Sequence, residues 1–150
     1  MASKWVVCAV FVLGVISALP VAAAPSCTTK ATQGYRGFVC EGYAALAPGA
    51  PQLPVRILGT CIATESGDFS CDGIANLSGT VLPIQLQGPG TIEPDCTGRI
   101  TYRQTIAGQP APDVTVSLVV FDGGDVIKSM SLGSTGVLSC LSERISKTLP

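Results

Sequence analysis

The sequence contains no histidine, and this absence excludes several kinds of active site. Ser-His-Asp and Cys-His catalysis both use an imidazole as the general base, so neither is available to this chain. Zinc sites built on histidine are excluded for the same reason, and no C-x-x-C pair is present that would indicate a four-cysteine site. No glycine-rich loop stands between an expected strand and a helix, where it would bind a phosphate or a dinucleotide. We therefore expect neither a metal ion nor a cofactor.

Charged residues are also scarce, at 13% of the sequence, and their formal net charge is -1. Binding to nucleic acid or to an anionic membrane needs lysine and arginine gathered in one region, whereas the few charges here are scattered. We therefore expect no nucleic-acid partner, and no membrane association once the N-terminal segment has been removed.

The N-terminal segment has the three parts of a secretory signal peptide. Lys4 supplies a positive charge, residues 5–16 are apolar, and small residues lead to Ala23. Pro20 interrupts the apolar stretch before it reaches the roughly 20 residues that a transmembrane helix needs. We expect cleavage after Ala23, which leaves a single domain, residues 24–150, in the periplasm or outside the cell.

Cleavage would also remove Cys8, and the cysteines that remain are even in number. They are Cys27, Cys40, Cys61, Cys71, Cys96 and Cys140. An even set in an exported domain indicates up to three disulfides, for which fifteen connectivities exist. One pairing has a local argument: Cys61 and Cys71 are equally far from Ser66 in an expected turn over residues 65–68. They would then face each other across two antiparallel strands.

The mature sequence lacks any long segment with helical periodicity. Short runs rich in valine, isoleucine, threonine and aromatic residues alternate instead with glycine, proline, aspartate and serine. We expect strands over residues 34–40, 54–64, 69–75, 79–87, 90–93, 99–106, 113–121, 126–132 and 137–141. Residues 122–125, Asp-Gly-Gly-Asp, predict a tight hairpin with glycine at positive φ. The proline-rich residues 44–54 and 108–112 are expected to be loops. Eight or nine such strands are typical of a sandwich or a barrel.

Within residues 99–106, alternation separates two faces. The first face carries Ile100, Tyr102, Gln104 and Ile106. The second face carries Arg99 and Arg103, which face either water or a polar cavity. With histidine absent, carboxylates and tyrosines are the remaining candidates for chemistry. Asp95 has two interpretations: a general acid or base in a barrel mouth, or a side chain that caps the turn before Thr97. We name Tyr102, Gln104 and Asp95 as candidate ligand-binding residues, and no catalytic residue.

Two short motifs suggest a family. They are Asp95-Cys96-Thr97-Gly98 and Phe121-Asp122-Gly123-Gly124-Asp125. Together with the spacing from Gly67 to Gly136, they resemble small exported β-barrels of the calycin-like, allene-oxide-cyclase-like kind. Two features depart from that pattern: Ile92 stands where an aromatic residue is common, and the cysteine content is higher. The resemblance implies a single all-β domain, an eight-stranded antiparallel barrel with a central cavity, stapled here by disulfides. It implies no reaction, since fold does not fix function.

Three functions follow from this reading. The first is non-enzymatic binding of a small apolar ligand, or of a partner protein, since eight strands enclose room for one small ligand. The second is an isomerase or cyclase, which requires Asp72, Glu93 or Asp95 to point into the cavity. The third is an interaction protein such as a peptidase inhibitor, which would use residues 44–54 or the N-terminal arm as a wedge and would have a filled barrel.

Overall fold

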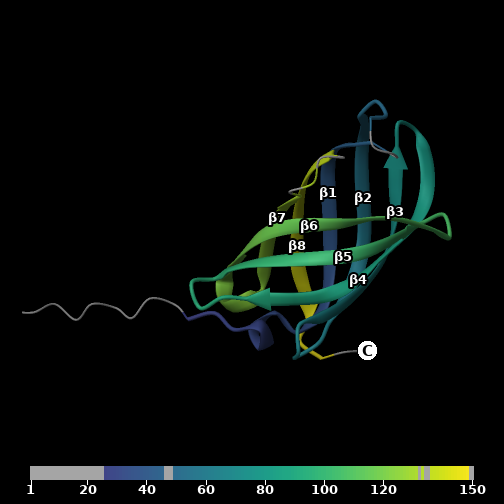
Figure 1. Cartoon of the computed structure of the whole chain (residues 1–150). Helices are drawn as coiled ribbons and strands as arrows, with labels where there is room; N and C mark the ends of the chain where they lie inside the picture. The colour runs from purple at the N-terminus through teal and green to yellow at the C-terminus, as the bar shows by residue number, and fades with distance from the viewer. Residues whose placement is uncertain (1–25, 46–48, 132, 134–135, 149–150) are drawn as a thin grey trace, which may run out of the picture.

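The fold is that of a computed structural model, which describes residues 26–45, 49–131, 133 and 136–148 (Figure 1). The expected signal peptide and its cleavage site lie outside these residues, as does part of the expected loop over 44–54. The elements in chain order are η1 (Thr29–Thr32), β1 (Gly34–Ala44), β2 (Leu53–Ala63), β3 (Asp68–Leu77), β4 (Thr80–Ile92), β5 (Thr97–Ile106), β6 (Gln109–Phe121), η2 (Asp122–Gly124), β7 (Val126–Ser131) and β8 (Gly136–Ser146).

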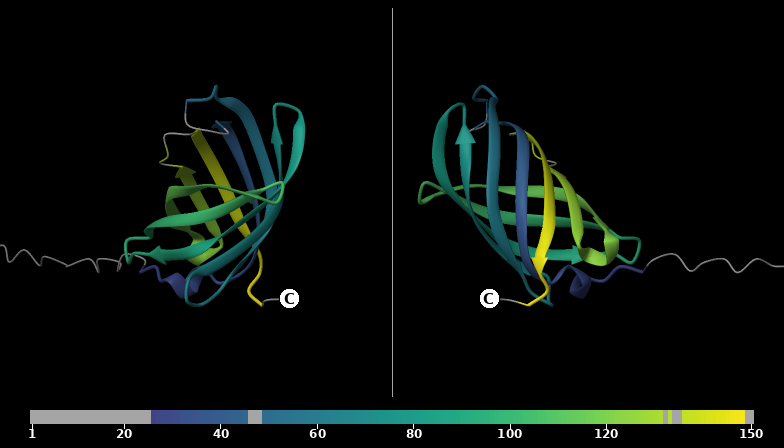
Figure 2. Two further views of the ribbon diagram at one scale, coloured as in Figure 1. Left: turned by 45° about the vertical axis from the view of Figure 1, so that its right-hand side comes forward. Right: turned by 180° about the vertical axis from the view of Figure 1, so that it is seen from behind.

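The eight strands close into one antiparallel barrel. Each strand pairs with the next along the chain, and β8 returns to pair with β1, so the sheet has no free edge. In Figure 1, β5 and β6 run across the wall formed by β1, β2 and β8, and Figure 2 shows that wall from behind. The predicted all-β, eight-stranded antiparallel barrel is therefore confirmed. Among the described residues, no helix has the length and apolar character to cross a membrane.

Alternation along each strand decides which side chains fill the barrel. On β1, Arg36, Phe38 and Cys40 are buried, whereas Val39 and Glu41, at the alternate positions, are exposed. The buried hydrophobic residues of β1 to β4 form one continuous cluster inside the barrel. A smaller cluster, built on β6, lies against the N-terminal arm. The core is thus the inward face of a single sheet.

Strand β5 follows the predicted alternation. The side chains of Ile100, Tyr102 and Gln104 lie on the more buried face, and Arg99 and Arg103 are exposed. The basic face of this strand is therefore turned to solvent. Of the two environments considered for it, water is the one found.

The predicted boundaries of β4 and of the start of β6 were wrong. The strands expected over residues 79–87 and 90–93 are one strand, β4 (Thr80–Ile92), because Gly88 and Pro89 continue the ladder with β3. Residues 108–112 were expected to be a loop, but β6 already begins at Gln109. Proline is tolerated there because the pairing between β5 and β6 is irregular: Tyr102 pairs with Val114 but Gln104 pairs with Ala111.

Three disulfides tie the barrel together. Cys61–Cys71 joins directly paired positions of β2 and β3, which confirms the predicted bond. Cys40–Cys140 joins directly paired positions of β1 and β8, where the barrel closes. Cys27–Cys96 fastens the N-terminal arm to the turn between β4 and β5. Disulfides persist in oxidising compartments, so this set indicates an environment outside the reducing cytosol.

We expect the barrel-closing disulfide to contribute most to stability. Cys40–Cys140 spans 100 residues and Cys61–Cys71 only 10. In the chain-entropy account a 100-residue loop is worth about 4.7 kcal/mol, and a loop this short less than about 3 kcal/mol. Urea titrations of the Cys40→Ala/Cys140→Ala and Cys61→Ala/Cys71→Ala variants measure the two losses in unfolding free energy. An equal or larger loss for the second variant would contradict this ranking.

Candidate functional site: the barrel interior

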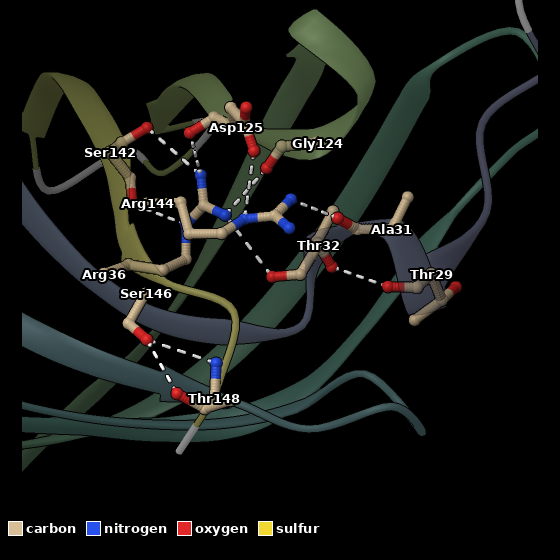
Figure 3. A network of polar contacts seen from close by, with 10 residues as sticks. All are labelled: Thr29, Ala31, Thr32, Arg36, Gly124, Asp125, Ser142, Arg144, Ser146 and Thr148. Atoms are coloured by element: carbon tan, nitrogen blue, oxygen red, sulfur yellow. Dashed lines mark hydrogen bonds and ion pairs between the residues drawn. The ribbon is translucent and has the colours of Figure 1, made fainter. Parts of the chain in front are cut away.

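One end of the barrel is closed around the side chain of Arg36, which is 2% exposed. Its guanidinium donates five hydrogen bonds (Figure 3). Nε donates to Ser142 Oγ at 3.0 Å, and the two terminal nitrogens donate to the carbonyls of Thr32, Gly124, Asp125 and Ser142 at 2.8–3.3 Å. Five is the full donor capacity of an arginine, so the buried charge is completely hydrogen-bonded.

A second arginine reinforces this end. The side chain of Arg144 is 8% exposed, and it donates from a terminal nitrogen to the carbonyl of Ala31. Its Nε lies 3.2 Å from Asp125 Oδ1, which makes an ion pair although the N–H is not aligned for a hydrogen bond. Burial, together with the nearby charge of Arg144, lowers the pKa of Arg36 to about 10, and Asp125 opposes both effects. Two guanidinium groups therefore share one carboxylate here.

The Asp-Gly-Gly turn brings the backbone to these arginines. Asp122, Gly123 and Gly124 all have positive φ, at 51°, 64° and 101°, which confirms the predicted turn conformation. A Cβ on Gly124 would stand 2.0 Å from the carbonyl oxygen of Ala31, so only glycine fits. The motif therefore supplies two of the carbonyl acceptors of Arg36 and holds η2 against η1.

Next to the arginines, the barrel contains a cavity of about 140 Å³, which we call the inner cavity. Its walls include the aromatic rings of Phe38, Phe69 and Tyr102. Both cross-strand disulfides also line it: Cys40, Cys61, Cys71 and Cys140. Its lining also has polar residues: Thr29, Thr32, Arg36, Ser129 and Ser142. The inner cavity is thus an aromatic and sulfur-rich space with one polar side.

A second space, which we call the outer cavity, occupies the barrel farther from the arginines and measures about 300 Å³. Its lining is mainly aliphatic and comes from strands all around the barrel: Val55, Ile57, Ala75, Leu77, Leu82, Ile84, Ile106, Val114 and Leu138. Connecting residues Ala45, Ala107 and Gly133 also take part. No aromatic side chain lines it within the described part of the chain. The two cavities therefore differ in chemistry as well as in size.

Tyr102, the first of the predicted ligand-binding residues, lines the inner cavity. Its ring packs edge-on against Phe69, with 6.2 Å between centroids and 82° between planes. Burial raises the pKa of its phenol to about 12. Within residues 26–45, 49–131, 133 and 136–148, its hydroxyl makes no hydrogen bond, so it is available to a bound molecule.

Gln104 lines the outer cavity and not the inner one, so the structure separates it from Tyr102. Its Nε2 donates to the carbonyl of Pro112 at 2.9 Å. That hydrogen bond spans the irregular pairing of β5 and β6, and it occupies one donor of the amide. Gln104 therefore stabilises the pairing of β5 and β6, whether or not it also contacts a ligand.

Asp95, the third candidate, lies outside both cavities in the exposed turn between β4 and β5. Its Oδ1 accepts from Thr97 Oγ1 at 2.7 Å and from the Thr97 backbone N–H at 3.0 Å. These hydrogen bonds, chiefly the one from the Thr97 hydroxyl, lower the pKa of the carboxyl. Of its two interpretations, the turn cap is the one found, and the cavity-facing acid is not.

The other two carboxylates of the enzyme hypothesis also face outward. Asp72 is exposed and accepts from Gln85 Nε2 at 2.9 Å, and Glu93 is exposed near the turn that contains Asp95. The isomerase hypothesis required one of the three to point into the cavity. None of the three carboxylates meets this requirement, so the isomerase hypothesis has no candidate acid or base among them.

Sequence reasoning missed the residues that define the inner cavity. Arg36, Phe38 and Cys40 stand at alternate positions of one strand, so they share its inward face. The sequence did contain a signal: an arginine at the same alternation as buried apolar residues. Such an arginine indicates a buried charge that either has a function or has all its N–H groups hydrogen-bonded. Ser142 was missed because the last strand was expected to end at residue 141, whereas β8 continues to Ser146.

Neither protein-family models, nor curated proteins, nor solved structures match this chain. The resemblance carried by the Asp95–Gly98 and Phe121–Asp125 motifs therefore stays a prediction. Among the described residues, no group of three or more cysteine, aspartate or glutamate side chains is arranged to hold a metal ion.

The pKa of Tyr102 gives a test of the cavity environment. The unfolded phenol titrates near 10.0 and the folded one at about 12, so the folded state holds its proton longer. Its contribution to stability is complete below about pH 10 and is lost as the pH rises toward about 12. An ultraviolet titration should show a tyrosine step at about 12 that Tyr102→Phe removes and the control Tyr43→Phe leaves in place. Persistence of that step in Tyr102→Phe would contradict the assignment.

Proposed function

We propose that this protein is an exported, non-enzymatic barrel that binds a small apolar ligand in its interior. The observation that carries the proposal is the pair of cavities, about 140 and 300 Å³, lined mainly by inward-facing apolar side chains. Small-molecule sites are typically concave and mostly apolar, with a few polar groups that orient the ligand. Tyr102, Ser129 and Ser142 are such groups in the inner cavity.

The rigid frame of the barrel supports ligand binding. A closed barrel with two disulfides across its strands holds the cavity walls in place, which lowers the ordering cost of binding. The carboxylates considered for acid–base chemistry are all on the outside. The interior thus offers shape and hydrogen bonds to a ligand, and it presents none of the carboxylates that the isomerase hypothesis named.

The proposal of export rests on two independent features. The three disulfides indicate an oxidising compartment. Residues 1–23 have the pattern of a cleavable secretory signal. We propose that the mature chain begins at Ala24 and works in the periplasm or outside the cell.

The alternative of a peptidase inhibitor is less well supported. It required a barrel filled by side chains, and the interior contains two cavities instead. Part of its expected wedge, residues 46–48, lies outside the described residues.

Filling the outer cavity tests ligand binding directly. Ala75 is 5% exposed and lines that cavity, so Ala75→Leu places three more carbon atoms inside it. The apolar fluorophore N-phenyl-1-naphthylamine should bind the wild-type protein saturably with increased fluorescence. Inserting this volume where the ligand would lie costs about 1–3 kcal/mol of binding free energy, so the variant should bind roughly 5- to 150-fold more weakly.

The matched control is Ser70→Leu, which adds a leucine to the exposed face of the same strand. It should leave the affinity for the fluorophore unchanged, and circular dichroism should show that both variants fold. Equal affinities for the fluorophore in Ala75→Leu and Ser70→Leu would overturn the proposal.

A further inference from the structure

The inner cavity has features that a generic apolar site would not need. Its aromatic rings, those of Phe38, Phe69 and Tyr102, come from three different strands, β1, β3 and β5. Four cysteine sulfurs complete much of the remaining wall. Aromatic rings pack favourably against other rings edge-on or offset, and sulfur is favourable at a ring edge. Such walls favour an aromatic ring over an aliphatic chain.

Two serines of β7 and β8 contribute to the polar lining of this cavity, beside Arg36 and the threonines of η1. Ser129 pairs with Cys140, and Ile127 pairs with Ser142, so the two serines are diagonal neighbours on the inner wall. Ser142 Oγ accepts from Arg36 Nε at 3.0 Å, which leaves the serine proton free to be donated. The hydroxyl of Ser129 makes no hydrogen bond with any part of the chain that the structure describes. Two adjacent hydroxyl donors therefore face the cavity.

The charge behind these serines is positive. Arg36 and Arg144 are both buried, and Asp125, which pairs with Arg144, has a side chain 56% exposed to solvent. A charge in solvent is screened more than a charge in the interior, so Asp125 only partly offsets the two guanidinium groups on the cavity side. The field favours a negative group held by the serines.

The size of the inner cavity limits what enters. Its volume of about 140 Å³ is close to the roughly 150 Å³ of an engineered apolar cavity that holds benzene. The ring of the ligand is therefore a single six-membered one. A bicyclic system would need the outer cavity.

We propose that the inner cavity binds a monocyclic aromatic carboxylate, with its ring among Phe38, Phe69 and Tyr102 and its carboxylate on the hydroxyls of Ser129 and Ser142. The serine hydroxyls and the net positive field of the two arginines offset the desolvation of the carboxylate. Arg36 acts through Ser142, because its own five donors are already used. This inference rests on the proposed ligand-binding function and assigns a ligand class to one of its two cavities.

The test compares probes that share a ring and differ in charge: benzoate, toluene and benzylamine, each followed by ligand-detected NMR with the wild-type protein. Benzoate should bind most tightly and benzylamine most weakly, by at least about tenfold, because a hydrogen bond to a charged group is the stronger kind. Equal affinity for benzoate and toluene would overturn the inference, as would preference for benzylamine.

The Ser129→Ala variant tests the contribution of a serine hydroxyl to carboxylate binding in the inner cavity. Ser129 is not an acceptor for either arginine, so its loss leaves the closed end intact, unlike Ser142→Ala, which removes a partner of Arg36. We expect roughly tenfold weaker benzoate binding and unchanged toluene binding. The control Ser139→Ala, on the exposed face of β8, should change neither. Unchanged benzoate affinity in Ser129→Ala would overturn the assignment of the serines.

Binding of the fluorophore distinguishes a wrong ligand class from a failure of the proposed ligand-binding function. If N-phenyl-1-naphthylamine binds and benzoate does not, the barrel is a binding protein and the ligand class is wrong. If neither the fluorophore nor any of the three single-ring probes binds, the proposed function fails as well.

Discussion

The buried guanidinium of Arg36 is the constraint on which the closed end of the barrel depends. An unpaired charge in the interior is costly, so each of its five N–H groups must meet an acceptor. Those acceptors come from the end of η1, from the Asp-Gly-Gly turn and from β8, which lie far apart in the sequence. Satisfying one side chain therefore fixes the positions of three segments. Together these segments close the barrel beside the inner cavity.

The space inside depends on a balance between large and small inward residues. Phe38 is large, and its ring passes over Gly59 on the neighbouring strand, where a Cβ would stand 2.7 Å from its Cε1. Disulfides occupy two further positions where a pair of apolar side chains would otherwise meet. A pair of linked cysteines fills less volume than two leucines, so the wall is covalently fixed without filling the centre. The two cross-strand disulfides thus stabilise the wall of the barrel and also leave space at its centre.

Local features of the fold were predictable from local sequence. Alternation placed Tyr102 and Gln104 on the inward face, the spacing around Ser66 gave Cys61–Cys71, and Asp-Gly-Gly-Asp gave the turn before β7. Each of these depends on residues within about ten positions of one another. The geometry of neighbouring residues was therefore sufficient to predict these three features.

Features that depend on closure were not predictable in this way. Cys40–Cys140 exists because β8 pairs with β1 across 100 residues, and no local pattern selects it among fifteen connectivities. Arg36 resembles a surface charge until the barrel closes over it. The strand through Pro110 and Pro112 was missed because an irregular pairing, visible only in three dimensions, makes proline acceptable. Asp95 took a structural role because its hydrogen bonds to Thr97 lie entirely within one turn.

A crystal of the protein pressurised with xenon should reveal whether the closed barrel keeps a permanent apolar interior. Xenon occupies apolar cavities of this size without needing a specific chemical contact. We expect one xenon site among Phe38, Phe69 and Tyr102, and further xenon in the aliphatic space beside Ala75. A crystal that takes up no xenon at either place, with the inward side chains packed together across the axis, would contradict it.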